Sequence, residues 1–204
     1  MGEPLPVRAA GGRRLEVERE NAKPLLANFL VFQIGWFACV LGGANGLPWV
    51  GTGIALAIVA WHLTRAMRPK QELLLVLSAA AIGLVFDSLL VALGWLAYPS
   101  GTLIAGTAPH WIVALWMLFA ITLNLSLAWL KRRLVVAVLF GAIGGPLAYL
   151  GGAKLGALSF VAPTPGLIAL AVGWALLTPA LVMLSLRFDG FVSRLDAATE
   201  ASHA

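Results

Sequence analysis

Charged residues are scarce in this chain. Of its 204 residues, 11% are charged and 60% are hydrophobic, whereas an ordinary soluble domain is ~25% charged and ~45–50% apolar. The mean hydropathy is +0.91. This composition excludes a water-soluble enzyme and a disordered chain, and a single cysteine, Cys39, excludes an internal disulfide. It predicts an integral membrane protein.

Motifs that carry chemistry are also missing. The three histidines, His62, His110 and His203, do not have the spacing of metal ligands, so we expect no metal. No nucleophile elbow is present, since Ser88 follows Asp87 directly and lies on a different helix face. Phosphate-loop and dinucleotide fingerprints are absent, so we expect no cofactor. The sequence leaves open whether the protein is an enzyme.

Long apolar runs without charged residues make up most of the chain. A membrane-spanning helix needs ~20 such residues, and apolarity on all sides of each run favours a helical bundle. We therefore predict an all-α, polytopic transmembrane bundle of six helices. A transmembrane domain at 25–187 would lie between polar tails at 1–24 and 188–204. The six helices are expected at about 25–42, 48–66, 73–97, 110–130, 134–151 and 166–187.

Basic residues lie on alternate connections of this bundle. Thirteen of the fourteen lysines and arginines fall in the two tails, between the second and third helices, or between the fourth and fifth, and Lys154 alone lies on the other side. The positive-inside rule then predicts that both termini are cytoplasmic. The net charge of +5 indicates contact with anionic membrane lipids and not with nucleic acid.

Asp87 is the one acid that we place inside a predicted helix; the other eight fall in tails or inner loops. A charged Asp at the bilayer centre costs at least ~2.5–3.5 kcal/mol. Asp87 should therefore face the bundle and find hydrogen-bond donors, and Gly83 and Gly94 on its helix face would allow a neighbour to approach. Its role is either an interhelical hydrogen bond or the binding of a ligand or proton, which makes Asp87 the candidate catalytic residue.

A count of 1.5 Å per residue along each helix gives the depth of other side chains. Tyr149, Trp116 and Trp174 arrive near the level of Asp87, in the outer half of the bilayer. We expect these four residues to line one pocket, with Tyr149 within reach of Asp87.

A second polar layer is expected in the inner half, where Gln33, His62, Asn124 and Thr178 come from four helices at comparable depths. Such side chains either form hydrogen bonds between helices or line a pocket for a lipid head group. His62 lies too far from Asp87, along straight helices, for a direct hydrogen bond.

Two further features concern packing. The outer connections 98–109 and 152–165 carry one charge between them, so they either pack on the bundle or form lids or re-entrant segments. The fifth helix carries a stripe of glycines, which typically marks close packing against another helix. The stripe consists of Gly141, Gly145, Gly152 and Gly156.

Three strings of the sequence carry a resemblance. They are N-F-L-V-F-Q-I-G-W-F-A-C-V-L-G-G, P-H-W-I-V-A-L-W-M-L-F-A-I-T-L-N-L-S and F-G-A-I-G-G-P-L-A-Y-L-G-G. Over about 25–187 the chain resembles domain of unknown function 2878, a family of small proteobacterial membrane proteins. The resemblance implies a multi-pass protein of the bacterial inner membrane and assigns no catalytic residue. Its gene neighbours resemble cyclopropane-fatty-acid synthases and flavin amine-oxidases, which implies a link to lipid modification by association.

Three functions remain open. The first is a protein that binds or helps to modify a lipid or other lipophile in an intramembrane pocket. The second is a small-solute or proton-coupled transporter with Asp87 as carrier, and the third is a non-catalytic scaffold for a lipid-modifying enzyme. A pocket beside Asp87 favours the first, a continuous polar path the second, and a bundle without a cavity the third. The oligomeric state is not indicated. The candidate ligand-binding residues are Asp87, Tyr149, Trp116, Trp174, Gln33, His62 and Asn124.

Overall fold

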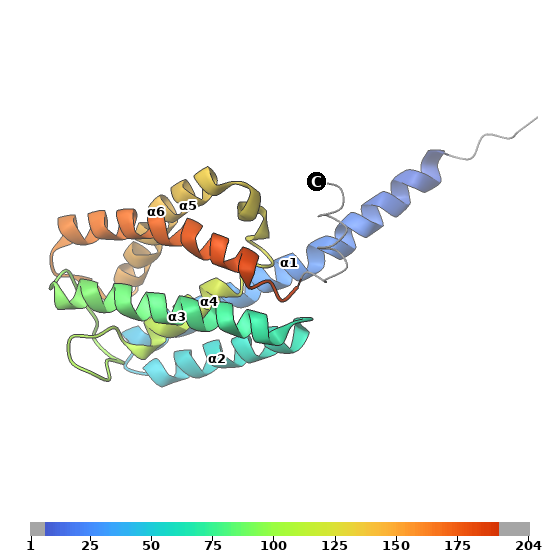
Figure 1. The fold of residues 1–204 in the computed structure, drawn as a ribbon. Coiled ribbons are helices and arrows are strands. Elements are labelled where there is room, and N and C mark those ends of the chain that lie inside the picture. Colours follow the sequence, from blue (N-terminus) through green and yellow to red (C-terminus); the bar gives the residue numbers. More distant parts are fainter. Residues whose placement is uncertain (1–6, 192–204) are drawn as a thin grey trace, which may run out of the picture.

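The computed structural model describes residues 7–191, with side-chain surroundings from residue 23 onward. Over these residues the fold is helical, as predicted, with six α-helices and one short 3₁₀ helix, η1 (Figure 1). Two strands of two residues each join the outer connections. The elements are α1 (Val7–Ala44), α2 (Pro48–Arg65), α3 (Pro69–Ala92), β1 (Leu96–Ala97), α4 (His110–Ala120), η1 (Ala128–Arg132), α5 (Leu134–Lys154), β2 (Ser159–Phe160) and α6 (Pro163–Arg187).

Four of the described helices are long and apolar enough to cross a membrane: α1 from Lys23 onward, α3, α5 and α6. Their outward faces carry large exposed hydrophobic side chains, among them Val85, Val135 and Leu176. Apolar surface of this extent is unfavourable in water and suits contact with lipid. The fold is therefore that of a membrane protein.

The boundaries of several helices differ from the prediction. Helix α1 begins at Val7, so much of the predicted N-terminal tail is helical, while the predicted C-terminal tail lies outside the described residues from residue 192 onward. Helix α3 runs over Pro69–Ala92 and not 73–97, because Gly94 ends it with φ of +69°. The N–H groups of Gly94 and Trp95 donate hydrogen bonds to the carbonyls of Val91 and Leu90, respectively. This pattern is a Schellman motif. The prediction that Gly94 shares the helix face of Asp87 is therefore wrong.

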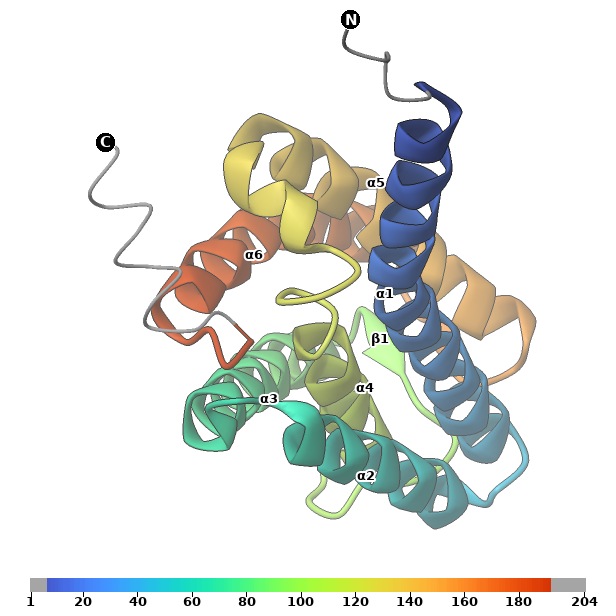
Figure 2. The same cartoon turned by 90° about the vertical axis from the view of Figure 1, so that its right-hand side faces the viewer.

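Helix α4 lies at the centre of the bundle, packed against α1, α2 and α3 (Figure 2). It ends at Ala120, well short of the predicted 130, and the chain continues in turns to η1. Irregular backbone at membrane depth is tolerated where protein surrounds it. Here Asn28 of α1 donates to the carbonyl of Ile121 at 3.0 Å and accepts from the hydroxyl of Ser126 at 2.7 Å. These bonds replace part of the missing helical ladder.

Helices α5 and α6 pack side by side through the glycine stripe (Figure 1). Gly141 lies against the carbonyl of Trp174 and the hydroxyl of Thr178, and Gly145 lies against the indole of Trp174. A Cβ at either glycine would overlap these atoms. The predicted role of the stripe is therefore confirmed at these two positions.

The outer connections meet each other. Strand β1 pairs with β2 in antiparallel register, with Leu96 opposite Phe160. Ala108, Ala157 and Leu158 are buried against the helices, while the tip at Leu103 is exposed. These parts of the connections pack on the bundle, as the first of the two predicted alternatives requires.

Candidate functional site

Asp87 is fully buried in α3 and accepts three hydrogen bonds. Its Oδ1 accepts from the hydroxyls of Tyr149, at 2.6 Å, and Tyr98, at 3.0 Å. Its Oδ2 accepts from Nε1 of Trp116 at 2.7 Å. The predicted inward orientation and the contact with Tyr149 are thus confirmed, and Tyr98 is a partner that the sequence reasoning missed.

All three of these donors are uncharged. Burial, and then the neighbouring carboxyl of Asp87, raises the pKa of Tyr98 well above its ordinary value, so its phenol keeps the proton that it donates. The donors come from the segment after β1, from α4 and from α5. We call Asp87, Tyr98, Trp116 and Tyr149 the Asp87 centre. It joins four parts of the chain through one carboxyl group.

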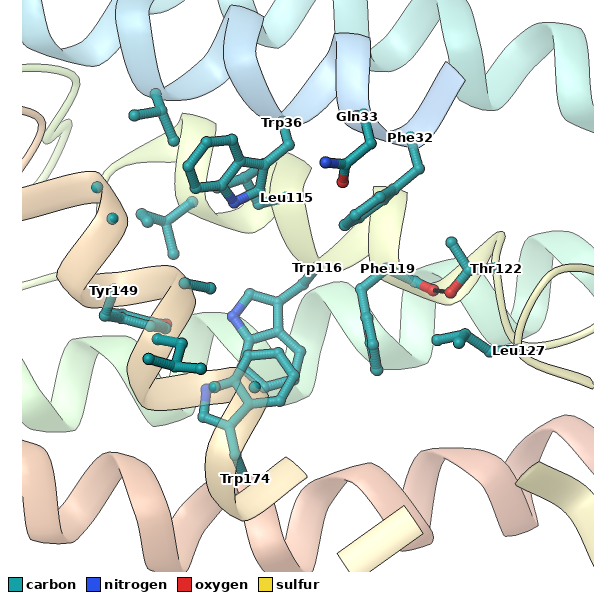
Figure 3. Close-up of a pocket in the computed structure, with 18 of the residues that line it drawn as sticks. Phe32, Gln33, Trp36, Leu115, Trp116, Phe119, Thr122, Leu127, Tyr149 and Trp174 are labelled. Carbon is teal, nitrogen blue, oxygen red and sulfur yellow. Dashed lines mark hydrogen bonds between the residues drawn. The ribbon is translucent and has the colours of Figure 1, made fainter. Parts of the chain in front are cut away.

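A cavity of about 440 Å³ lies between α1, α4 and α5, with Trp174 of α6 at its floor (Figure 3). Its volume falls within the ~300–1,000 Å³ typical of small-molecule sites. Most of the wall is hydrophobic, and nine lining residues are aromatic. These are Phe29, Phe32, Trp36, Trp111, Trp116, Phe119, Phe140, Tyr149 and Trp174.

Asp87 stands behind the wall of this cavity and does not line it. Its partners Tyr149 and Trp116 do line it, and Trp116 stacks on Trp174 with ring centroids 4.5 Å apart. The Nε1–H of Trp174 lies near the hydroxyl of Tyr149 without a hydrogen bond of ordinary geometry. The expectation of one pocket is thus correct for three residues and wrong for Asp87, whose oxygens are already occupied.

The inner polar layer is organised around Glu72, which the sequence pattern assigns to a loop. Because α3 begins at Pro69 and not at 73, Glu72 lies in its first turn and is buried. Its carboxylate contacts Nε2 of His62 at 3.0 Å and accepts from the amide of Asn124 and from the backbone N–H of Gly190. A proline at the first position followed by an acid in the first turn is a typical helix start, and this signal was available in P-K-Q-E.

Two further charged groups extend this cluster. Nζ of Lys131 donates to Oδ1 of Asn124 and to Oδ2 of Asp189, both at 2.6 Å. Asn124 also donates to the carbonyl of Phe188 at 3.0 Å. We call His62, Glu72, Asn124, Lys131 and Asp189 the Glu72 centre. Through these hydrogen bonds it links the chain just after α6 to α2, α3 and η1.

The other two members of the expected inner layer lie elsewhere. Gln33 faces the cavity, and among the described residues its amide has no hydrogen-bond partner. The hydroxyl of Thr178 is buried beside Gly141, also without a partner in the described part of the chain. Of the four residues expected together, the structure brings His62 and Asn124 to one cluster through Glu72.

The two centres are separate. Asp87 follows Glu72 by fifteen positions on α3, roughly 22 Å along a helix. The buried side chains between them on this helix are apolar: Leu75, Val76, Ala79 and Ala80. Within residues 23–191, no group of three or more His, Cys, Asp or Glu side chains gathers as a metal site would require.

Comparison with known proteins gives one match. The family model described as "Protein of unknown function (DUF2878)" matches residues 25–180. The chain therefore belongs to this family, as the resemblance in its sequence indicated. No curated protein and no solved structure matches the chain.

Proposed function

We propose that this member of the DUF2878 family binds a lipophilic molecule, drawn from the surrounding bilayer, in the cavity between α1, α4 and α5. The observation that carries the proposal is the wall of the cavity, which is mostly apolar and aromatic and has no charged residue. Binding sites for small molecules are typically concave, apolar and aromatic, with few polar groups. A ligand that is itself apolar fits such a wall.

The position of the cavity supports access from lipid. Helix α1 packs against α2 and α4, and α5 packs against α6, so the cavity lies between two groups of helices. Three of its lining side chains are largely exposed and not enclosed by other helices: Phe29 by 48%, Phe140 by 40% and Leu147 by 59%. An apolar molecule entering between α1 and α5 would meet hydrocarbon-like surface throughout.

The shape of the cavity favours an elongated ligand. On α1 its lining extends from Phe29 to Val40, and on α5 from Phe140 to Gly152. These stretches are roughly 16 Å and 18 Å long at 1.5 Å per residue. An acyl or isoprenoid chain aligned with the helices would suit this length better than a compact ligand.

We also propose that the chain crosses a bacterial inner membrane six times, with both termini in the cytoplasm. Helix α4 and the turns through η1 would form one crossing, with its irregular half shielded by the bundle. The asymmetry of the basic residues supports this orientation. Reporter fusions at the C-terminus should be active in the cytoplasm, and periplasmic activity would refute the proposal.

Within this function, Asp87 is a positioning residue that holds Tyr149 and Trp116 in the cavity wall. The transporter alternative, with Asp87 as a proton carrier, is less well supported because apolar residues separate Asp87 from Glu72. A purely structural scaffold would not need the cavity. We propose a lipid-modifying enzyme as a partner, which would act on the bound lipophile.

Gly144 offers a direct test. It lines the cavity, and a Cβ there would meet its nearest neighbour, a ring carbon of Phe140, at an ordinary 4.0 Å. A leucine at Gly144 should therefore extend into the cavity without disturbing the helices. Mass spectrometry of small molecules that co-purify with the protein should show a lipophile with wild type and a severalfold loss with Gly144→Leu.

Gly53 provides the matched control. It is an exposed helical glycine on α2, and a Cβ there would have no neighbour within 4 Å. Gly53→Leu makes the same chemical change away from the cavity and should retain the lipophile. Equal retention by wild type, Gly144→Leu and Gly53→Leu would show that the molecule binds elsewhere.

A further inference from the structure

Gln33 is a polar side chain of the cavity wall that belongs to neither the Asp87 centre nor the Glu72 centre. It comes from α1, and Figure 3 shows its amide directed into the cavity between Phe32 and Trp36. Among the described residues no donor or acceptor pairs with it, whereas the hydroxyls of Thr122 and Ser126 in the same wall do have partners. Thr122 donates to the carbonyl of Phe119, and Ser126 donates to Asn28.

The depth of Gln33 makes an unpaired amide unusual. Gln33 lies ten residues after Lys23, about 15 Å along the helix, which is close to the middle of a hydrocarbon core ~30 Å thick. The side chain of Gln33 is only partly buried, but a polar group at this depth has no water to pair with, and amides in membranes commonly pair across helices. A partner supplied by a ligand would satisfy this group.

The remainder of the wall restricts the charge of that ligand. No Asp, Glu, Lys, Arg or His side chain lines the cavity, and the oxygens of Asp87 behind the wall are occupied by Tyr98, Trp116 and Tyr149. A charged group in an apolar site without a counterion is strongly disfavoured. The ligand should therefore be uncharged.

We propose that the cavity selects an uncharged, elongated lipophile with a hydroxyl or carbonyl oxygen, which binds the amide of Gln33. This inference rests on the proposed function and adds the chemical class of the ligand. A carboxamide both donates and accepts hydrogen bonds, so it suits a hydroxyl or a carbonyl. The oxygen is held inside the membrane, near the middle of the stretch that α1 contributes to the wall.

The test uses probes of one chain length. Bromohexadecane bound in the cavity quenches the tryptophans of the wall, and hexadecanol, hexadecane and ionised palmitate compete with it. The protein is used in detergent, and Gly144→Leu gives the background from quenching outside the cavity. In wild type, hexadecanol should compete about threefold to tenfold better than hexadecane, the gain from one neutral hydrogen bond. Palmitate should be the weakest competitor.

Gln33→Leu should make hexadecanol and hexadecane equal while leaving the binding of hexadecane unchanged. Gln33→Met, which keeps the unbranched shape, is the second variant, and circular dichroism checks that both are folded. If hexadecanol still competes better than hexadecane by the same factor in the folded variants, the proposed role of Gln33 is wrong. This result would leave the proposed function itself unaffected. Quenching that is the same in wild type and Gly144→Leu would instead overturn the proposed function.

Discussion

Two buried carboxylates on α3 are stabilised in different ways. Asp87 accepts from two tyrosine hydroxyls and one indole, all uncharged. Glu72 contacts a histidine, and its amide partner Asn124 connects it to the ion pair of Lys131 with Asp189. The two centres differ in the charge of their partners although they share one helix.

Depth explains the difference. Lys131 and Asp189 are 13% and 14% exposed and lie at the end of the bundle, where ions retain some contact with water. Tyr149 and Trp116 are more deeply buried, where removing an ion pair from water costs more than its attraction returns. Neutral donors satisfy a carboxyl group there without adding a second charge.

The two centres also hold different parts of the molecule. The Asp87 centre supports the cavity wall at Tyr149 and Trp116, whereas the Glu72 centre fastens the chain after α6 at Phe188 and Gly190. The first should therefore affect ligand binding when it is altered, and the second should affect stability alone.

Asp87→Leu should have the largest effect on stability. It leaves the hydroxyls of Tyr98 and Tyr149 and the indole N–H of Trp116 without an acceptor in a region that water does not reach. At ~1–3 kcal/mol for each unpaired group, the free energy of unfolding should fall by about 3 kcal/mol or more. Thermal unfolding in detergent measures this. A variant as stable as wild type would contradict the anchoring role.

Asp87→Asn distinguishes anchoring from proton transfer. Its oxygen can still accept from both tyrosines, but its NH₂ group then faces the N–H of Trp116, so stability should fall by about 1–3 kcal/mol. Ligand binding should persist once the protein is folded. A folded Asn variant that binds its ligand but has lost an activity of wild type would assign the proton a direct role.

Glu72→Ala should be less harmful than Asp87→Leu. It removes the acceptor of His62, Asn124 and the Gly190 N–H, but water from the nearby membrane surface can enter the space that it leaves. We expect a loss of about 2 kcal/mol in the same unfolding measurement, with no change in lipophile retention. A larger loss of stability in Glu72→Ala than in Asp87→Leu would refute the argument from depth.

Adjacent glycines of α5 give the next comparison. Gly145→Leu should destabilise the protein by about 1–3 kcal/mol, because its side chain would overlap the indole of Trp174. Gly144→Leu, one residue away, should fold normally and lose the ligand. Equal melting temperatures for the two variants would show that α5 and α6 do not need the glycine contact.

Lys131→Met should have the smallest effect. The ion pair with Asp189 is partly exposed, so its loss should cost about 1 kcal/mol. Added salt should reduce the difference in melting temperature between this variant and wild type. A difference that does not depend on salt would indicate that packing, and not charge, accounts for the contribution of Lys131.

Depth counting along apolar runs predicted much of the fold and the contact between Asp87 and Tyr149, because the rise of a helix is constant. It missed Tyr98, which reaches Asp87 where β1 and β2 pair, and two-residue strands leave no pattern in a sequence. Depth counting also missed Glu72, because the predicted start of the third helix, at 73, lies four residues after the true start of α3 at Pro69. The early end of α4 depends on Asn28, 93 positions away, and no local pattern reports such a contact.

Photolabelling tests the central claim most directly. A hexadecanol with a diazirine on its chain is illuminated in membranes that contain the protein, and the labelled residues are mapped by peptide mass spectrometry. The account predicts label at cavity residues such as Trp36 and Leu115 in wild type and Gly53→Leu, and its loss in Gly144→Leu. Label confined to lipid-facing residues such as Val85 and Val135, equal in all three proteins, would contradict it.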